Sequence, residues 1–224
     1  GNHSLSTMSS KHPLKTAEKH LSIQSTHPYE TLNERTPETK NVWVVFHGIG
    51  YLSRYFLRHF QHLDPKENYI VCPQAPSLYY LDKTYTHIGA SWLTRENTGI
   101  YMENLLHLFD ELYLKEGLDT APSLVLMGYS QGVSVLCRWI AARKLKCNRL
   151  VLYAGRVPDE LEAADFAHLP TETPVEFYIG DSDPFITALD RKTMIRRLEG
   201  LFGDRLQIRE YSGGHNLNNH HIVG

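Results

Sequence analysis

Apolar side chains along the chain follow two spacings, one typical of β-strands and one typical of helices. The run from Asn41 to Phe46 is almost continuously β-branched or aromatic, which indicates a strand covered on both faces. Residues 100–114 instead place their apolar side chains at helical spacing on one face. These patterns predict strands at 20–25, 41–46, 68–72, 123–127, 149–153, 174–179 and 206–211, and helices at 51–63, 100–114, 131–145 and 187–202.

Strands that alternate with helices in this way predict an α/β fold. Right-handed crossovers then give a mostly parallel central sheet with helices on both faces. We expect residues 1–18 to be a flexible N-terminal tail, because they are polar and aperiodic, and residues 19–224 to form a single domain. Residues 158–173 are polar with scattered apolar positions, so they could form a short flap over a site or only a connection.

Composition and charge narrow the possible functions. The 224 residues are 42% hydrophobic and 21% charged, as in ordinary globular domains. The 23 Lys and Arg nearly balance the 25 Asp and Glu, which argues against a nucleic-acid partner. No apolar run approaches the ~20 residues of a membrane span. Three cysteines without CxxC spacing indicate free thiols and a cytoplasmic location, although a removed N-terminal leader stays open because the chain begins at Gly1.

One pentapeptide carries specific chemistry. Gly128-Tyr-Ser-Gln-Gly132 follows a predicted strand and precedes a predicted helix, which is the strand–turn–helix context of a G-x-S-x-G nucleophile elbow. Glycines allow the sharp turn that lifts a serine hydroxyl above the sheet. The helix N-terminus that follows offers unpaired N–H groups to a developing negative charge. Ser130 is therefore the candidate nucleophile.

A serine nucleophile needs a base, and the base needs an orienting carboxylate. Candidate carboxylates Asp181 and Asp183 follow the strand predicted at 174–179, and His215 follows the last strand. The order Ser, Asp, His along the chain is that of α/β-hydrolases. His220 and His221 lie nearby in a polar stretch, and we expect them to have surface roles.

The motifs together resemble those of the phospholipase/carboxylesterase group of α/β-hydrolases, which includes the acyl-protein thioesterases. The resemblance covers residues 40–216 and implies an α/β-hydrolase fold with no large cap domain. It also implies Ser130 as nucleophile, His215 as general base and Asp183, favoured over Asp181, as the acid. The resembling segments are His47-Gly-Ile-Gly50, Pro73-Gln-Ala-Pro76, Ala90-Ser-Trp92, Gly128-Tyr-Ser-Gln-Gly132, Gly180-Asp-Ser-Asp183-Pro184 and Tyr211-Ser-Gly-Gly-His215.

The same resemblance suggests the groups around the reacting atoms. The backbone N–H groups of Ile49 and Gln131 are the expected oxyanion donors. His47 is expected to support its turn by hydrogen bonding. Four aromatic residues near predicted site loops are candidates for a substrate pocket, with core or rim packing as the alternative: Tyr51, Tyr80, Trp92 and Phe185. Tyr51 also stands where the better-known thioesterases carry an acid, which weakens the case for thioesterase specificity.

The favoured function is hydrolysis of carboxylic esters through an acyl-enzyme, with a small-molecule ester or thioester as substrate. A thioesterase or lysophospholipase on the same triad is the alternative within hydrolases, and a non-catalytic binding protein on the same fold is the alternative outside them. Residues 48–53 could also form the glycine-rich turn of a dinucleotide-binding site. The third glycine and the acidic residue after the next strand are missing, which argues against that function. We expect no cofactor and no metal, and the oligomeric state stays open.

Overall fold

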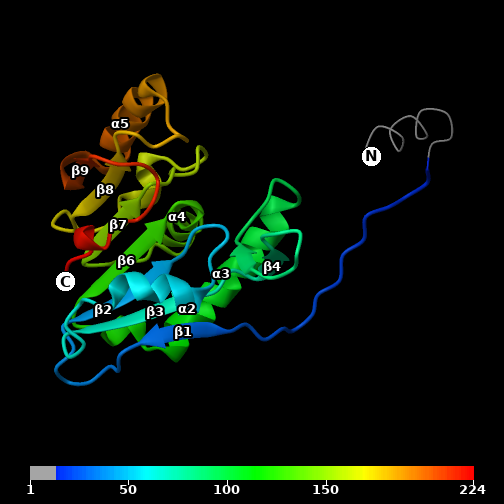
Figure 1. The fold of residues 1–224 in the computed structure, drawn as a ribbon, viewed down its shortest axis with the longest axis horizontal. Helices are drawn as coiled ribbons and strands as arrows, with labels where there is room; N and C mark the ends of the chain where they lie inside the picture. The colour runs from blue at the N-terminus through cyan, green and yellow to red at the C-terminus, as the bar shows by residue number, and fades with distance from the viewer. Residues whose placement is uncertain (1–13) are drawn as a thin grey trace.

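A seven-stranded sheet forms the centre of the protein (Figure 1). The computed structural model describes residues 14–224. The strand order is β1-β3-β2-β6-β7-β8-β9; β1 is antiparallel to β3 and the other neighbours are parallel. The strands of this sheet are β1 (Tyr29–Leu32), β2 (Asn41–Phe46), β3 (Asn68–Pro73), β6 (Leu124–Tyr129), β7 (Arg149–Tyr153), β8 (Val175–Gly180) and β9 (Leu206–Tyr211).

Helices and short turns connect these strands. A separate antiparallel hairpin consists of β4 (Ser77–Tyr80) and β5 (Ile88–Ser91). The α-helices are α2 (Ser53–Phe56), α3 (Thr98–Lys115), α4 (Gln131–Arg143) and α5 (Ala188–Phe202). The 3₁₀ turns are η1 (Leu57–Phe60), η2 (Leu118–Thr120), η3 (Ala163–Phe166), η4 (Gly203–Arg205) and η5 (Asn219–His221). Within residues 14–224, no helix is long and apolar enough to cross a membrane.

Two apolar cores lie on opposite faces of the sheet. Helices α3, α4 and α5 cover one face, where Phe46 packs edge to face against Phe109 and Trp139. On the other face lie α2, η1 and the C-terminal segment, represented by Phe56 and Ile222. The strand pairing Phe46↔Gly128 aligns the ends of β2 and β6, and the later strands continue the same edge. Residues that follow the parallel strands therefore meet at one edge, where ligands bind in such folds.

Most predicted elements are confirmed to within a few residues. The predicted strand at 20–25 is wrong: residues 14–28 are exposed and form neither helix nor strand. The first strand is instead β1, at the edge of the sheet. The helix predicted at 51–63 is shorter, consisting of α2 followed by η1. Residues 1–13 of the expected tail lie outside the described residues, and the boundary at residue 19 stays a prediction.

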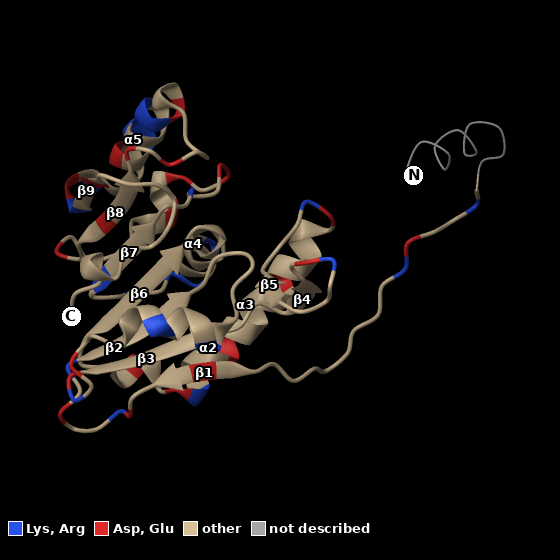
Figure 2. Ribbon diagram, in the orientation of Figure 1, with Lys and Arg blue, Asp and Glu red and all other residues tan. Residues whose placement is uncertain are grey.

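The segment at 158–173 is a packed connection. Its turn η3 contacts both α4 and α5, and Phe166 and Leu169 are buried in the core of that face. Charged residues of both signs are interspersed on the surface elements, as on α5 (Figure 2). No inserted domain lies between the strands of the described chain, which agrees with the expectation of a fold without a large cap.

A buried neutral histidine holds the end of β2. His47 is fully buried; the Ala75 N–H donates to its Nε2 at 3.0 Å, and its Nδ1–H donates to the Gly48 carbonyl at 2.7 Å. Burial lowers the pKa of His47 to about 4. A proton on Nε2 would remove the acceptor that Ala75 needs. This agrees with the structural role expected for His47.

The low pKa of His47 predicts loss of stability in mild acid. The unfolded chain binds a proton at His47 below about pH 6.5, whereas the folded chain does not do so until about pH 4. Between these values the free energy of unfolding should fall by about 1.4 kcal/mol per pH unit because of this residue. Urea denaturation of the wild type and His47→Gln at pH 7 and pH 5 measures this. The fall should be smaller in the variant, and equal falls in the two proteins would contradict the assignment.

Candidate active site

Ser130 lies in a strained turn between β6 and α4. Its backbone has φ 53° and ψ −119°, which is unusual for a residue with a side chain. Two close approaches keep the turn this tight. A Cβ on Gly132 would lie 2.1 Å from the Phe46 carbonyl oxygen, and one on Gly128 would lie 2.8 Å from the backbone of Val133. Only glycine fits either position, so the G-x-S-x-G pattern has a direct steric cause.

The structure brings Ser130, His215 and Asp183 together. Ser130 Oγ lies 2.8 Å from His215 Nε2, and His215 Nδ1 lies 2.9 Å from Asp183 Oδ2. The Asp183 side chain is fully buried, whereas the His215 side chain is 22% exposed. With Nδ1–H donating to the carboxylate, Nε2 is free to accept the serine proton. The three side chains thus form one hydrogen-bonded chain that ends near solvent.

The two candidate carboxylates have different partners. Asp183 Oδ1 accepts from the Phe185 N–H at 2.9 Å, which fixes the carboxylate while Oδ2 faces His215. Asp181 is exposed, and it accepts from the Gly213 N–H at 2.9 Å and from the Ser182 hydroxyl at 3.0 Å. The Gly213 N–H is the main cause of the lowered pKa of Asp181. Asp181 therefore joins two loops, and Asp183 is the partner of the histidine.

Two backbone N–H groups near Ser130 are available to a ligand. A Cβ on Gly48 would lie 3.3 Å from Ser130 Cβ, so the loop that contains Ile49 runs against the serine. The next N–H group along this loop, that of Gly50, is already occupied, because it donates to the Ala90 carbonyl. Among residues 14–224, neither the Ile49 nor the Gln131 N–H has a hydrogen-bond acceptor. Gln131 is also the first residue of α4, where the helix dipole favours negative charge.

The Gln131 side chain has a structural role that the sequence analysis missed. Its Oε1 accepts from the Trp92 N–H at 2.9 Å, and its Nε2 donates to the Leu93 carbonyl at 2.9 Å. It therefore ties the start of α4 to the segment after β5. Trp92 is 2% exposed; its indole stacks on His47 and donates to the His47 carbonyl at 2.8 Å. Trp92 thus differs from the expectation of a pocket residue: it packs in the core and supports the loop.

The other three aromatic candidates lie closer to solvent. Phe185 is 71% exposed, and its ring centroid is 4.7 Å from that of His215. Tyr80 is exposed on the β4–β5 hairpin. Tyr51 is half-buried, pairs with Ala90 and contacts Tyr129 edge to face. Of these three, Phe185 lies against the His215 ring.

Several tyrosines behind His215 were not singled out from the sequence. Tyr129 OH donates to the His215 carbonyl at 3.0 Å. The expectation for His221 is wrong: it is half-buried, stacks on Tyr178 and lies 2.7 Å from Tyr153 OH. His220 is exposed, as expected. In the sequence these residues are visible only as tyrosines at the ends of several strands, and that pattern is equally typical of ordinary core packing.

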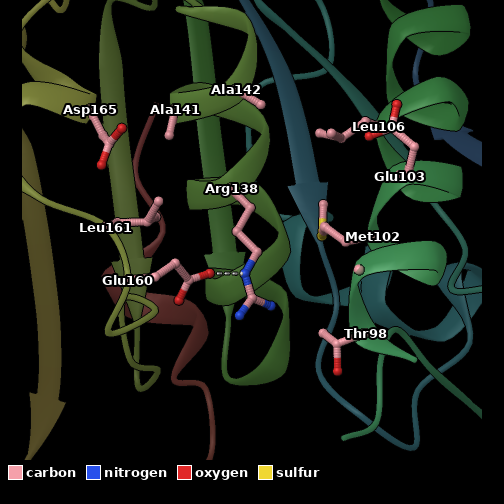
Figure 3. A pocket seen from close by; sticks show the side chains of 11 residues that line it. Thr98, Met102, Glu103, Leu106, Arg138, Ala141, Ala142, Glu160, Leu161 and Asp165 are labelled. Atoms are coloured by element: carbon pink, nitrogen blue, oxygen red, sulfur yellow. Dashed lines mark hydrogen bonds and ion pairs between the residues drawn. The ribbon is translucent and has the colours of Figure 1, made fainter. Parts of the chain in front are cut away.

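A separate groove of about 440 Å³ lies between α3, α4 and the segment around η3 (Figure 3). Arg138 of α4 pairs with Glu160 at 2.7 Å, and both residues line the groove together with Met102 and Leu161. None of the three linked residues of the candidate site lines this groove. Within the described part of the chain, no three His, Cys, Asp or Glu side chains gather in a way that could hold a metal ion.

No protein-family model and no curated protein sequence matches this chain. Solved structures match its fold over most of their length. The acyl-protein thioesterase 2 of Zea mays is 15% identical with a TM-score of 0.62, covering 86% of this chain and 93% of that chain. The carboxylesterase of Mesorhizobium loti is 16% identical with a TM-score of 0.64, covering 86% and 88%. Esterase PE8 is 21% identical with a TM-score of 0.63, covering 88% and 93%. The chain therefore has the α/β-hydrolase fold of these esterases and thioesterases, without a large cap domain.

Proposed function

We propose that this chain is a serine hydrolase that cleaves carboxylic esters through an acyl-enzyme intermediate. The observation that carries the proposal is the hydrogen-bonded chain from Ser130 through His215 to Asp183, with the serine on a strained turn. The fold that it shares with carboxylesterases supports the same reaction class. The substrate is a small-molecule ester, and the three buried free thiols suit a cytoplasmic location.

The first half of the proposed reaction forms the acyl-enzyme. Ser130 Oγ attacks the ester carbonyl carbon while its proton passes to His215 Nε2. Asp183 stabilises the resulting imidazolium through Nδ1–H. The carbonyl oxygen becomes an oxyanion, to which the Ile49 and Gln131 N–H groups donate. When the C–O bond breaks, the leaving alkoxide takes the proton from Nε2 and departs as the alcohol.

The second half releases the acid. Water attacks the acyl-enzyme carbonyl carbon while His215 Nε2 accepts its proton. The new tetrahedral intermediate uses the same two N–H donors and collapses by breaking the bond to Ser130 Oγ, which regains its proton from His215. At the end of each half His215 is neutral again, and at the end of the second half Ser130 also carries its proton.

Two residues beside the linked Ser130, His215 and Asp183 are exposed: Ile49 to 53% and Phe185 to 71%. This exposure supports an acyl-binding site that is open to solvent. We propose Tyr51, Tyr80 and Phe185 as residues that contact the substrate, and short or medium acyl chains as the preferred ones. Hydrolysis of esters of increasing chain length distinguishes this open site from a deep tunnel. In a tunnel, each further buried CH₂ would stabilise the bound ester by about 0.8 kcal/mol.

The role of Ser130 is tested by hydrolysis of p-nitrophenyl esters and by labelling with a serine-directed phosphonate. The wild type should be active and labelled at Ser130. Ser130→Ala should lose roughly 10⁴-fold or more in kcat, because it removes the nucleophile. Ser182→Ala is the matched control: it removes a nearby hydroxyl that donates to Asp181, and it should remain active.

Each other outcome identifies an alternative. Hydrolysis of acyl thioesters but not of esters, lost in Ser130→Ala, would indicate a thioesterase. Folded protein that neither hydrolyses nor reacts with the phosphonate would indicate a binding protein without catalysis. Unchanged activity in Ser130→Ala would refute the proposed nucleophile.

The two aspartates provide a second test. Asp183→Asn should lower kcat by roughly 10²–10⁴-fold, because an amide does not hold the Nδ1–H tautomer of His215 as a carboxylate does. Asp181→Asn should stay within a few fold of the wild type, since its amide oxygen can still accept from the Gly213 N–H. Steady-state kinetics on one ester compares the two variants. A larger loss in Asp181→Asn than in Asp183→Asn would reverse the assignment.

A further inference from the structure

The loop that carries His215 has little backbone support of its own. Before it, Ser182 N–H donates to the Gly213 carbonyl at 2.8 Å; after it, His221 N–H donates to the Asn218 carbonyl at 3.0 Å. Within the described chain, no backbone–backbone hydrogen bond engages residues 214–217. Something else must hold the imidazole at hydrogen-bond distance from Ser130.

Three tyrosine hydroxyls bind the backbone of this loop. Tyr211 OH donates to the Gly214 carbonyl, Tyr129 OH donates to the His215 carbonyl, and Tyr153 OH accepts from the Asn218 N–H, each at 3.0 Å. The three tyrosines are the last residues of β9, β6 and β7. The sheet therefore holds the loop through hydroxyl groups on three strands.

The tyrosines are themselves held in place. The ring centroids of Tyr129 and Tyr211 lie 5.9 Å and 5.6 Å from that of Tyr153. Because the Tyr153 oxygen accepts from Asn218, its own proton can point to His221 Nδ1, 2.7 Å away. Burial lowers the pKa of His221 and so favours the neutral, accepting ring. Burial likewise raises the pKa of Tyr129 and of Tyr211, so both hydroxyls keep the protons they donate.

We propose that Tyr129, Tyr153 and Tyr211 are positioning residues: through their hydroxyl groups they hold His215 against Ser130 and Asp183. This proposal rests on the proposed function, in which His215 moves the proton. Tyr129 has the most direct effect, because it binds the carbonyl of His215 itself. The three hydroxyls bind the loop backbone, and the Tyr129 ring also lies beside the His215 ring, with the two centroids 5.6 Å apart.

Hydroxyl-deletion variants test the proposal while keeping the packed rings. In Tyr129→Phe and Tyr211→Phe, kcat for an ester should fall about 10-fold, because displacing a catalytic group by a fraction of an ångström is costly. KM should stay within about twofold, since the loop does not bind the acyl group. Tyr69→Phe is the matched control: it removes a hydroxyl that donates to Glu116, from the amino end of β3, and kcat should not change.

A second measurement does not depend on turnover. The His215 Nδ1–H that faces Asp183 should give a low-field proton NMR signal, assigned by its loss in His215→Ala. In Tyr129→Phe and Tyr211→Phe this signal should broaden through faster exchange with water, and in Tyr69→Phe it should persist. If the wild type hydrolyses no ester, this signal still supports or refutes the positioning role, whereas the phosphonate and ester tests decide the proposed function.

The proposal is overturned if kcat and the NMR signal of Tyr129→Phe and Tyr211→Phe both match those of the wild type. It is also overturned if Tyr69→Phe shows the same losses, because the effect would then be general destabilisation. A fall in kcat with unchanged KM and a broadened signal, confined to the site variants, supports it.

Discussion

The contact between α4 and the end of β2 is the constraint on which the candidate site depends. A Cβ on Gly132 would approach the Phe46 carbonyl oxygen to 2.1 Å, so the helix can lie against the strand only because residue 132 has no side chain. This approach forces the chain to turn sharply at Ser130, where φ is 53°. The turn raises the serine to the edge at which β8 and β9 end and the loops after them begin. Asp183 and His215 then need only short loops to reach it.

Much of this arrangement could be predicted because it follows from local pattern. Continuous apolar runs such as Asn41–Phe46 indicate strands buried on both faces, and glycines around a serine indicate a tight turn. Carboxyl ends of parallel strands share one edge, so a serine, an aspartate and a histidine at three such ends were expected to meet. The choice of Asp183 over Asp181 came from resemblance, and the hydrogen bonds explain it: Asp181 is occupied by the Gly213 N–H.

The failures involve features that local pattern does not determine. Residues 20–25 alternate as a strand does, but a strand also needs a neighbour, and the edge beside β3 is taken by β1. The β4–β5 hairpin was missed because its paired residues include exposed aromatic side chains, which have no buried face to reveal a period. The tyrosine hydroxyls behind His215 could not be foreseen either. A tyrosine at the end of a strand is typical of core packing, and the sequence does not show which loop its hydroxyl group binds.

In residues 14–224 no domain covers Ser130, and under the proposed function this affects the order of events in the catalytic cycle. In hydrolases with a mobile cap, opening of the cap can limit turnover. Under the proposed function, substrate and products would meet exposed side chains at the sheet edge, such as those of Ile49 and Phe185. Under the proposed function, bond breaking and making would then control the rate, and the basicity of the departing alkoxide would govern the acylation half, in which that group leaves. The proposed positioning by the three tyrosines would act on the same bond-breaking steps, because a fixed imidazole needs no rearrangement before it transfers a proton.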